Sequence, residues 1–363
     1  MKKKKIGILT NGGDCSGLNS VIRGASIRAK ILGHELIGIK RGLKGMIEPT
    51  KDIVSMVGNV YSEESLLTRS GSILLSNTKP ARKDENSFYS IKEGAVAAAQ
   101  AYKELCLDGL IYIGGDGSLS VVDLILSENK DVNIIAIPKT IDNDVDRTDI
   151  SIGFTTAVEI VSSAIENIRT TAISHERVMV IEVMGRDAGF IALYSGIATG
   201  VDVILMPEFR FNIEQLINKV KECYTSHKNH CLIVVSEAVE SETLKHSKAE
   251  TDPYFVKTQY NGIGEHISLI LKNYGFDSRA VVLGHTQRGG KTSILDRIIG
   301  SGFGVEAINA VDNDEKNLML AYKNNKILKL PIKDIVITLT RQVSVDHLYV
   351  NIAKNLGIYI GEI

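Results

Sequence analysis

Short apolar runs alternate with amphipathic stretches along most of this chain. Residues 6–9, 35–39, 109–113 and 134–138 are rich in aliphatic and β-branched side chains, and each run is predicted to be a buried strand. The stretches between these runs have helical spacing, which predicts helices over residues 18–32, 91–105 and 119–126.

The second half of the chain repeats this alternation. Further strands are predicted over 177–183, 201–206, 231–235 and 279–283, and further helices over 154–171, 188–199, 213–225 and 262–273. Residues 47–86 are polar and irregular, and residues 241–253 indicate a charged surface excursion. Strands that alternate with helices favour parallel pairing. We therefore expect an α/β fold of two doubly wound parallel-sheet subdomains, with the active site in the cleft between them.

Composition narrows the class of protein. The chain has 363 residues, 44% of them hydrophobic, and a net charge of −1, which argues against a nucleic acid or a membrane surface as the main partner. No stretch approaches the length of a membrane span, and the basic run Lys2 to Lys5 leads directly into a strand. The four cysteines have no CxxC spacing, so we expect free thiols in a reducing cytosol and a cytoplasmic location.

Two glycine turns indicate phosphate binding. The sequence GGDGS at 114–118 stands between a predicted strand and a predicted helix, a layout that points backbone N–H groups and a positive helix end at an anion. Asp116 adds a carboxylate suited to Mg²⁺ carried on phosphates. The turn at 10–14 has the same layout, and it is not the GxGxxG of a dinucleotide fold. Each turn could also be an ordinary strand-to-helix connection.

A third loop supplies the remaining chemistry. Strand 134–138 leads into residues 139–144, which hold a cation, a hydroxyl, two carboxylates and an amide. Neighbouring loops at the carboxyl edge of a parallel sheet face the same crevice. Phosphoryl transfer needs this combination of metal ligand, neutralising charge and base.

GGDGS followed by PKTIDND resembles the ATP/pyrophosphate-dependent 6-phosphofructokinase family. The resemblance runs from residue 6 to about 310, and the residues beyond carry no signature. It implies an ATP-binding subdomain at 1–152 plus 266–312, and a sugar-phosphate-binding subdomain at 153–265 plus 313–363. The other motifs in order are Met184-Gly185-Arg186, Pro207-Glu208, Ser236-Glu237 and the run GHTQRGG at 284–290.

The resemblance implies transfer of the γ-phosphoryl of MgATP to the 1-hydroxyl of fructose 6-phosphate. Asp142 would be the base that takes the hydroxyl proton, while Lys139, Thr140 and Arg186 would assist the transfer. Asp144 is a weaker candidate, and Asp116 would bind the metal. The implied ATP ligands are Gly13, Thr78, Lys79, Gly115, Asp116, Gly117 and Ser118. The implied sugar-phosphate ligands are Thr140, Ile141, Asp142, Arg177, Met184, Gly185, Arg186, Glu237, Arg279, His285, Thr286, Gln287 and Arg288.

The resemblance also implies an oligomer. In the family, the arginines that match Arg177 and Arg279 reach in from a neighbouring subunit, so we expect a homodimer or homotetramer with shared active sites. Arg23 and Arg169 match a basic effector site, but Ile27 replaces a further arginine there, and we do not expect the usual allostery.

Two positions bear on the phosphoryl donor. In the family, glycine after the GGD aspartate is associated with ATP and aspartate with pyrophosphate, so Gly117 favours ATP. Lys139 is common among pyrophosphate users, and the combination resembles the ATP-using members of the mixed-substrate branch. We give Gly117 more weight, because a carboxylate there would repel the α-phosphate of ATP.

Other functions stay open at this point. Thr78 and Val121 depart from an arginine and a glycine that are usual in the family. These departures keep open a catalytically silent, sugar-phosphate-binding regulatory paralogue, and Lys139 keeps open a pyrophosphate-dependent enzyme. An NAD kinase-like enzyme would share only GGDG, and the downstream motifs argue against it.

Overall fold

The computed structural model describes residues 2–48, 52–56, 59–79, 81, 83, 87–226, 228–241, 247–250, 256–259, 262–335 and 340–362. The chain divides into two compact units. The first unit comprises Met1–Ile141, Val145–Thr156 and Arg288–Thr340, and the second comprises Asp142–Asp144, Ala157–Gln287 and Arg341–Ile363. Among the described residues, no helix is long and apolar enough to span a bilayer.

The first unit is built on a sheet with a parallel centre and antiparallel edges. Its strand order is β14-β13-β5-β4-β1-β2-β3, and β6 pairs with the end of β5. The strands are β1 (Lys5–Thr10), β2 (Glu35–Ile39), β3 (Ile53–Ser55), β4 (Gly109–Gly114), β5 (Ile134–Thr140), β6 (Ile152–Gly153), β13 (Leu318–Lys323) and β14 (Lys326–Pro331).

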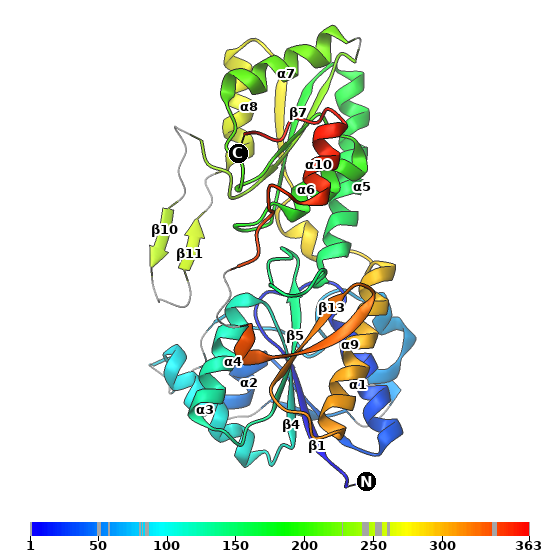
Figure 1. Ribbon diagram of the computed structural model, residues 1–363, viewed down its shortest axis with the longest axis vertical. Helices are drawn as coiled ribbons and strands as arrows, with labels where there is room; N and C mark the ends of the chain where they lie inside the picture. The colour runs from blue at the N-terminus through cyan, green and yellow to red at the C-terminus, as the bar shows by residue number, and fades with distance from the viewer. Residues whose placement is uncertain are drawn as a thin grey trace. The chain divides into compact units, whose positions relative to one another are not determined.

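Helices cover both faces of this sheet (Figure 1). On one face, α2, α3 and α4 pack over an apolar cluster that includes Leu9, Tyr112 and Ile134. On the other face lie α1 and α9. The helical elements are α1 (Leu18–Leu32), α2 (Gly42–Ile47), α3 (Ile91–Glu104), α4 (Asp116–Glu128) and α9 (Ile294–Asp312), with short 3₁₀ turns η1 (Asn59–Ser62), η2 (Glu64–Leu67) and η4 (Ile332–Asp334).

Small residues let α1 and α9 approach each other closely. A Cβ added at Gly304 would lie 2.2 Å from the carbonyl oxygen of Val21, and one at Gly24 would lie 2.5 Å from that of Ser301. No side chain can occupy such positions, so the two helices pack backbone against backbone. This contact fixes α9 on the sheet although it lies far from α1 in the sequence.

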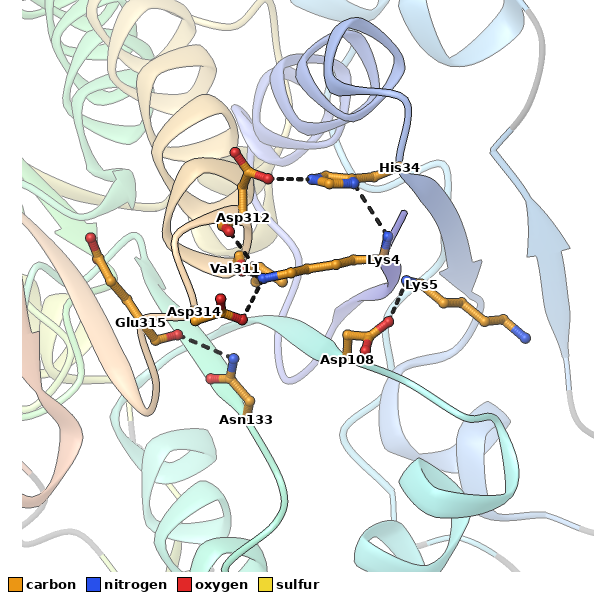
Figure 2. Close-up of polar contacts among 9 residues, drawn as sticks. All are labelled: Lys4, Lys5, His34, Asp108, Asn133, Val311, Asp312, Asp314 and Glu315. Atoms are coloured by element: carbon orange, nitrogen blue, oxygen red, sulfur yellow. Dashed lines mark hydrogen bonds and ion pairs between the residues drawn. The ribbon is translucent and has the colours of Figure 1, made fainter. Parts of the chain in front are cut away.

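The amino edge of the same sheet is tied to the end of α9 by polar contacts (Figure 2). Lys4 Nζ donates to the carbonyl oxygen of Val311 at 2.5 Å and pairs with Asp314 at 2.6 Å, which places a cation at the negative end of the helix. His34 Nδ1 accepts from the backbone N–H of Lys4 at 3.3 Å, so its Nε2 donates to Asp312 at 3.0 Å. The first residues of the chain are therefore an integral part of the fold.

The second unit is a smaller α/β layer structure. Its sheet is fully parallel in the order β12-β7-β9-β8, and β10 and β11 form a separate antiparallel pair. Helices α7 and α8 cover one face, and α5, α6 and α10 lie on the other (Figure 1). The strands are β7 (Val178–Val183), β8 (Val203–Leu205), β9 (Cys231–Ser236), β10 (Ser247–Glu250), β11 (Val256–Gln259) and β12 (Ser278–Val282). The helical elements are α5 (Phe154–Ser174), α6 (Phe190–Thr199), α7 (Ile213–Thr225), α8 (Ile263–Asn273), η3 (Gly284–Arg288) and α10 (Leu348–Asn355).

The predicted fold class is confirmed, and the segment boundaries need correction. Residues 266–287, assigned to the first subdomain from the sequence, belong to the second unit because β12 pairs with β7. Residues 313–335, assigned to the second, belong to the first unit because β13 pairs with β5. The predicted excursion at 241–253 includes β10, while residues 242–246 and 251–253 lie outside the described residues.

Candidate functional site

In the first unit, the two glycine turns lie side by side. Strands β1 and β4 are parallel neighbours, with Thr10 opposite Ile113. The N–H of Asn11 donates to the carbonyl oxygen of Ile113 at 2.9 Å. The turns after β1 and after β4 therefore leave the sheet at the same edge.

Two cationic side chains contact the backbone of the first glycine turn, at Gly13 and Asp14. Lys139 Nζ donates to the carbonyl oxygen of Gly13, and Arg288 Nη1 donates to that of Asp14 at 3.0 Å. A Cβ added at Gly13 would lie 2.8 Å from Arg288 Nη1. Arg288, expected among the sugar-phosphate ligands, thus lies against the turn expected to bind the nucleotide. The arrangement gathers positive charge around a backbone turn, which suits an anion.

Lys139 and Thr140 lie in a strand, where the sequence predicted a loop. Strand β5 continues through Thr140 because both residues pair with β6. Lys139 is only 4% exposed, and Ser151 Oγ donates to the carbonyl oxygen of Thr140 at 2.7 Å. Pairing with β6 therefore fixes the backbone at Lys139 and Thr140 more firmly than a loop would.

Helix α4 begins at the second glycine turn. Its N-cap is Gly115, which has no side chain to accept from the first N–H groups of the helix. A Cβ added at Gly117 would meet nothing within 4 Å, so the space next to the helix start is open. Ser118 is buried. A helix N-terminus with open space beside it is a suitable place for a phosphate group.

Asp116 is the first residue of α4, and its side chain lies outside the described residues. The described surroundings fit a magnesium ion carried by a nucleotide, because the position of Gly117 is uncrowded and backbone N–H groups at the helix start are available for the phosphates. Mg²⁺ takes few protein ligands when phosphate oxygens and water complete its shell.

A segment after the second strand lies along the first turn. The N–H of Gly12 donates to the carbonyl oxygen of Asn77 at 3.1 Å, and Ser76 Oγ donates to that of Gly12 at 2.6 Å. Asn77 Nδ2 donates to the carbonyl oxygen of Lys79, and the N–H of Lys79 donates to Asn77 Oδ1. The side chains of Thr78 and Lys79 are exposed. Thr78, at the position where the family usually has an arginine, is thus exposed, and the exposed Lys79 follows it.

Sequence reasoning missed one contact beneath these turns. Asn11 Nδ2 donates to the hydroxyl of Tyr112 at 2.9 Å, and burial raises the pKa of Tyr112. The tyrosine stays neutral and also interacts with Ser118. A polar tyrosine in an otherwise aliphatic strand was the available signal, since a buried hydroxyl needs a partner.

In the second unit, three consecutive polar residues are buried. Asp142 is 9% exposed, Asp144 2% and Asn143 0%, and Asn143 has a positive φ of 55°. A left-handed backbone conformation is costly for most residues. Glycine tolerates it best, and asparagine comes next. Asn143 therefore bends the backbone between Asp142 and Asp144.

Glu237 lies within electrostatic range of Asp142. Burial, followed by the charge of Asp142, raises the pKa of Glu237 to about 7, while the N–H of Arg186 opposes that shift. This N–H donates to Glu237 Oε1 at 3.2 Å. The charge of the predicted base therefore acts on the predicted sugar ligand, which directly follows the carboxyl end of β9.

The loop after β7 turns sharply before α6. Gly185 has a φ of 148° and a Cβ there would lie 2.5 Å from the carbonyl oxygen of Ala188, so only glycine fits. Arg186 also has a positive φ, of 54°, and its side chain is exposed. The N–H of Met184 donates to Gln287 Oε1 at 3.2 Å, which joins this loop to η3. Within η3, His285 and Thr286 are exposed and Gln287 is buried.

Arg177 and Arg279 lie at the opposite edge of the same sheet. Both pair with Asp277, at 2.6 Å each, at the amino ends of β7 and β12. Strand β7 has six residues and spans about 20 Å, so these arginines are far from Glu237 in the same chain. They therefore form a second group, separate from the carboxyl-edge residues of this unit.

Comparisons with known proteins identify the family of this chain. Residues 5–311 match the protein family described as PFK: Phosphofructokinase. An ATP-dependent 6-phosphofructokinase 1 of Synechocystis sp. is 41% identical, over 99% of this chain and 98% of that protein. A pyrophosphate–fructose 6-phosphate 1-phosphotransferase of Dictyoglomus thermophilum is 39% identical, over 92% of this chain and 93% of that protein.

A solved structure agrees with the fold. The pyrophosphate-dependent phosphofructokinase of Nitrosospira multiformis superposes with a TM-score of 0.80 at 19% identity, over 99% of this chain and 93% of that one. The match of residues 5–311, together with full-length relatives at about 40% identity, covers every motif described above. The chain belongs to the phosphofructokinase family.

Proposed function

We propose that this protein is an ATP-dependent 6-phosphofructokinase of glycolysis. It transfers the γ-phosphoryl of MgATP to the 1-hydroxyl of fructose 6-phosphate and gives fructose 1,6-bisphosphate and ADP. The observation that carries the choice of ATP is the open space at Gly117, where no neighbour lies within 4 Å of an added Cβ. ATP extends past its β-phosphate, so it needs room that pyrophosphate does not.

The first unit binds the donor. Backbone N–H groups at the glycine turns and at the start of α4 hold the phosphates, and Gly13, Gly115 and Ser118 line this region. Asp116 holds Mg²⁺, which neutralises phosphate charge when it is bound. Lys139, fixed by Gly13, supplies a further positive charge for the transferring group. Lys79 adds a mobile charge in place of the usual arginine.

The second unit binds and activates the acceptor. Asp142 takes the proton of the 1-hydroxyl as the bond to phosphorus forms. Arg186 stabilises the charge on the phosphoryl oxygens, and its backbone holds Glu237 in place. Glu237 accepts hydrogen bonds from sugar hydroxyls, and Met184 packs against the ring. The remaining proposed ligands of the sugar phosphate are Thr140, Ile141, Gly185, His285, Thr286, Gln287 and Arg288.

The 6-phosphate is bound by Arg177 and Arg279 of a neighbouring subunit. Their position at the amino edge, away from Glu237, supports this proposal, because they cannot serve the carboxyl-edge residues of their own unit. The protein is accordingly a homodimer or homotetramer with shared sites. A glycolytic role also implies action in the cytoplasm.

A coupled assay tests the function. Purified protein is given fructose 6-phosphate with MgATP and, separately, with pyrophosphate and Mg²⁺. Turnover with MgATP and little rate with pyrophosphate is the expected result. A preference for pyrophosphate would favour the alternative donor, and binding of fructose 6-phosphate without turnover by either donor would favour a silent regulatory paralogue.

A further inference from the structure

Glu208, in the Pro207-Glu208 motif, has no part in the mechanism above. Its Oε1 accepts two backbone hydrogen bonds, from the N–H of Gly189 at 2.9 Å and from the N–H of Val343 at 2.8 Å. Gly189 ends the loop that carries Arg186, and Val343 belongs to the last part of the chain. One carboxylate oxygen thus joins a catalytic loop to the C-terminal segment.

The C-terminal segment Arg341–Val343 also contacts the loop of the base. The N–H of Arg341 donates to the carbonyl oxygen of Asp144 at 2.8 Å. Gln342 Nε2 donates to the carbonyl oxygen of Asp187 at 3.1 Å, and the guanidinium of Arg341 lies 4.7 Å from the centre of the Phe190 ring. Three consecutive residues therefore bond to the Asp142–Asp144 loop, to the Arg186 loop and to Glu208.

We propose that Glu208 and the segment Arg341–Val343 are positioning residues that set the loop of Asp142 against the loop of Arg186. A hydrogen-bonded series runs from Asp144 to Arg341, along the backbone to Val343, and through Glu208 to Gly189. Base and arginine must be held within a fraction of an ångström for transfer, so loss of this series lowers turnover more than binding. The proposal rests on the proposed kinase function.

Two substitutions at Glu208 separate geometry from charge. Glu208→Gln keeps an oxygen that can accept both N–H groups. Burial raises the pKa of Glu208, so the uncharged amide also tests whether the carboxylate charge matters. Glu208→Ala removes the acceptor. We expect Glu208→Ala to lower kcat roughly 10- to 100-fold, with small changes in both KM values, and Glu208→Gln to restore most of it.

Asp202→Ala is the matched control. Asp202 accepts the N–H of Leu232 at 2.9 Å and pairs with Lys228, within the same unit and away from both loops. Asp202→Ala should lower the Tm of the protein and leave the kcat of the folded enzyme near the wild-type value. Gln342→Ala changes an exposed side chain, does not threaten folding, and should lower kcat roughly 2- to 10-fold.

Amide hydrogen exchange resolved by residue gives a readout that needs no activity. In Glu208→Ala, the N–H of Arg341 should exchange faster, although it does not touch Glu208, and it should be unchanged in Asp202→Ala. Faster exchange at only Gly189 and Val343, or equal losses of kcat in Glu208→Ala and Asp202→Ala, would overturn the proposal. A wild type without kinase activity would overturn the proposed function instead, and the exchange result would still decide the positioning role.

Discussion

Lys139 Nζ donates a hydrogen bond to the backbone carbonyl oxygen of Gly13. The contact joins the end of β5 to the turn after β1, so a buried ammonium is fixed beside the region expected to hold phosphates. A lysine held in this way can neutralise the phosphates of either donor. The discrimination between ATP and pyrophosphate then falls on Gly117, which lies beside open space.

Gly117→Asp should impair the use of ATP without unfolding the protein. The added side chain meets no neighbour within 4 Å of its Cβ, but its carboxylate would enter the space for the α-phosphate and repel it. We expect a large rise in the KM for MgATP and an appearance of activity with pyrophosphate. Gly117→Ala is the control, since it adds a Cβ without charge and should keep ATP turnover. Unimpaired ATP use in Gly117→Asp would show that the open space at Gly117 does not select ATP.

Asp142→Asn should lower kcat by roughly 10²- to 10⁴-fold, because an amide cannot take the proton of the attacking hydroxyl. Binding of fructose 6-phosphate, measured by calorimetry, should be retained. The substitution is nearly isosteric, so the buried loop should keep its shape. A variant with near-normal kcat would remove Asp142 from the role of base.

Arg279→Ala should raise the KM for fructose 6-phosphate much more than that for ATP. A hydrogen bond to a charged group contributes about 1.5–3 kcal/mol, which corresponds to roughly a 10- to 150-fold change. Steady-state kinetics with each substrate varied in turn measures the difference. Equal effects on both substrates would show that Arg279 does not bind the 6-phosphate.

Hybrid oligomers test whether that site is shared. Subunits with Arg279→Ala and subunits with Asp142→Ser are each defective, but a mixed oligomer contains some sites with both residues intact. Co-expression of the two variants should therefore recover part of the activity. No recovery in oligomers proven to be mixed would contradict a site shared between subunits.

Glu237→Gln should stabilise the protein at high pH. The pKa of Glu237 is raised from 4.5 to about 7, so the folded state binds this proton more tightly than the unfolded chain does. The resulting stability is fully present below about pH 4.5 and is lost as the pH rises through about 7. We expect the Tm of Glu237→Gln to exceed that of the wild type at pH 8, with the difference vanishing near pH 5. Glu222→Gln, at a position where the side chain is 65% exposed, should show no such trend.

The sequence was most informative where local signals suffice. Helices α1 and α7 and strand β2 have the predicted bounds, because their apolar spacing and flanking turns lie within the elements themselves. The glycine turns were also found, since strand, glycine and helix follow one another directly. Their convergence at one sheet edge followed from parallel pairing of β1 and β4.

The sequence was least informative where distant segments meet. Strand β13 pairs with β5 although Leu318 and Ile135 are far apart in the chain, and nothing local in either strand specifies that partner. The contacts of Arg341 and Val343 are made by backbone N–H groups, which every residue except proline possesses. Such contacts leave no mark on residue type, so neither the subdomain boundary nor the C-terminal segment could be read from composition.

The close packing of α1 against α9 has a consequence for synthesis of the chain. Strands β1, β2, β4 and β5 are complete once the ribosome has passed Thr140, but α9 ends at Asp312. Most of the second unit is made in the interval, and Arg341–Ile363 follow later. The part of the first sheet that α9 covers, and the side of α1 that packs against α9, therefore stay exposed while most of the second unit is translated. Nascent chains at that stage present apolar surface of the kind that chaperones bind.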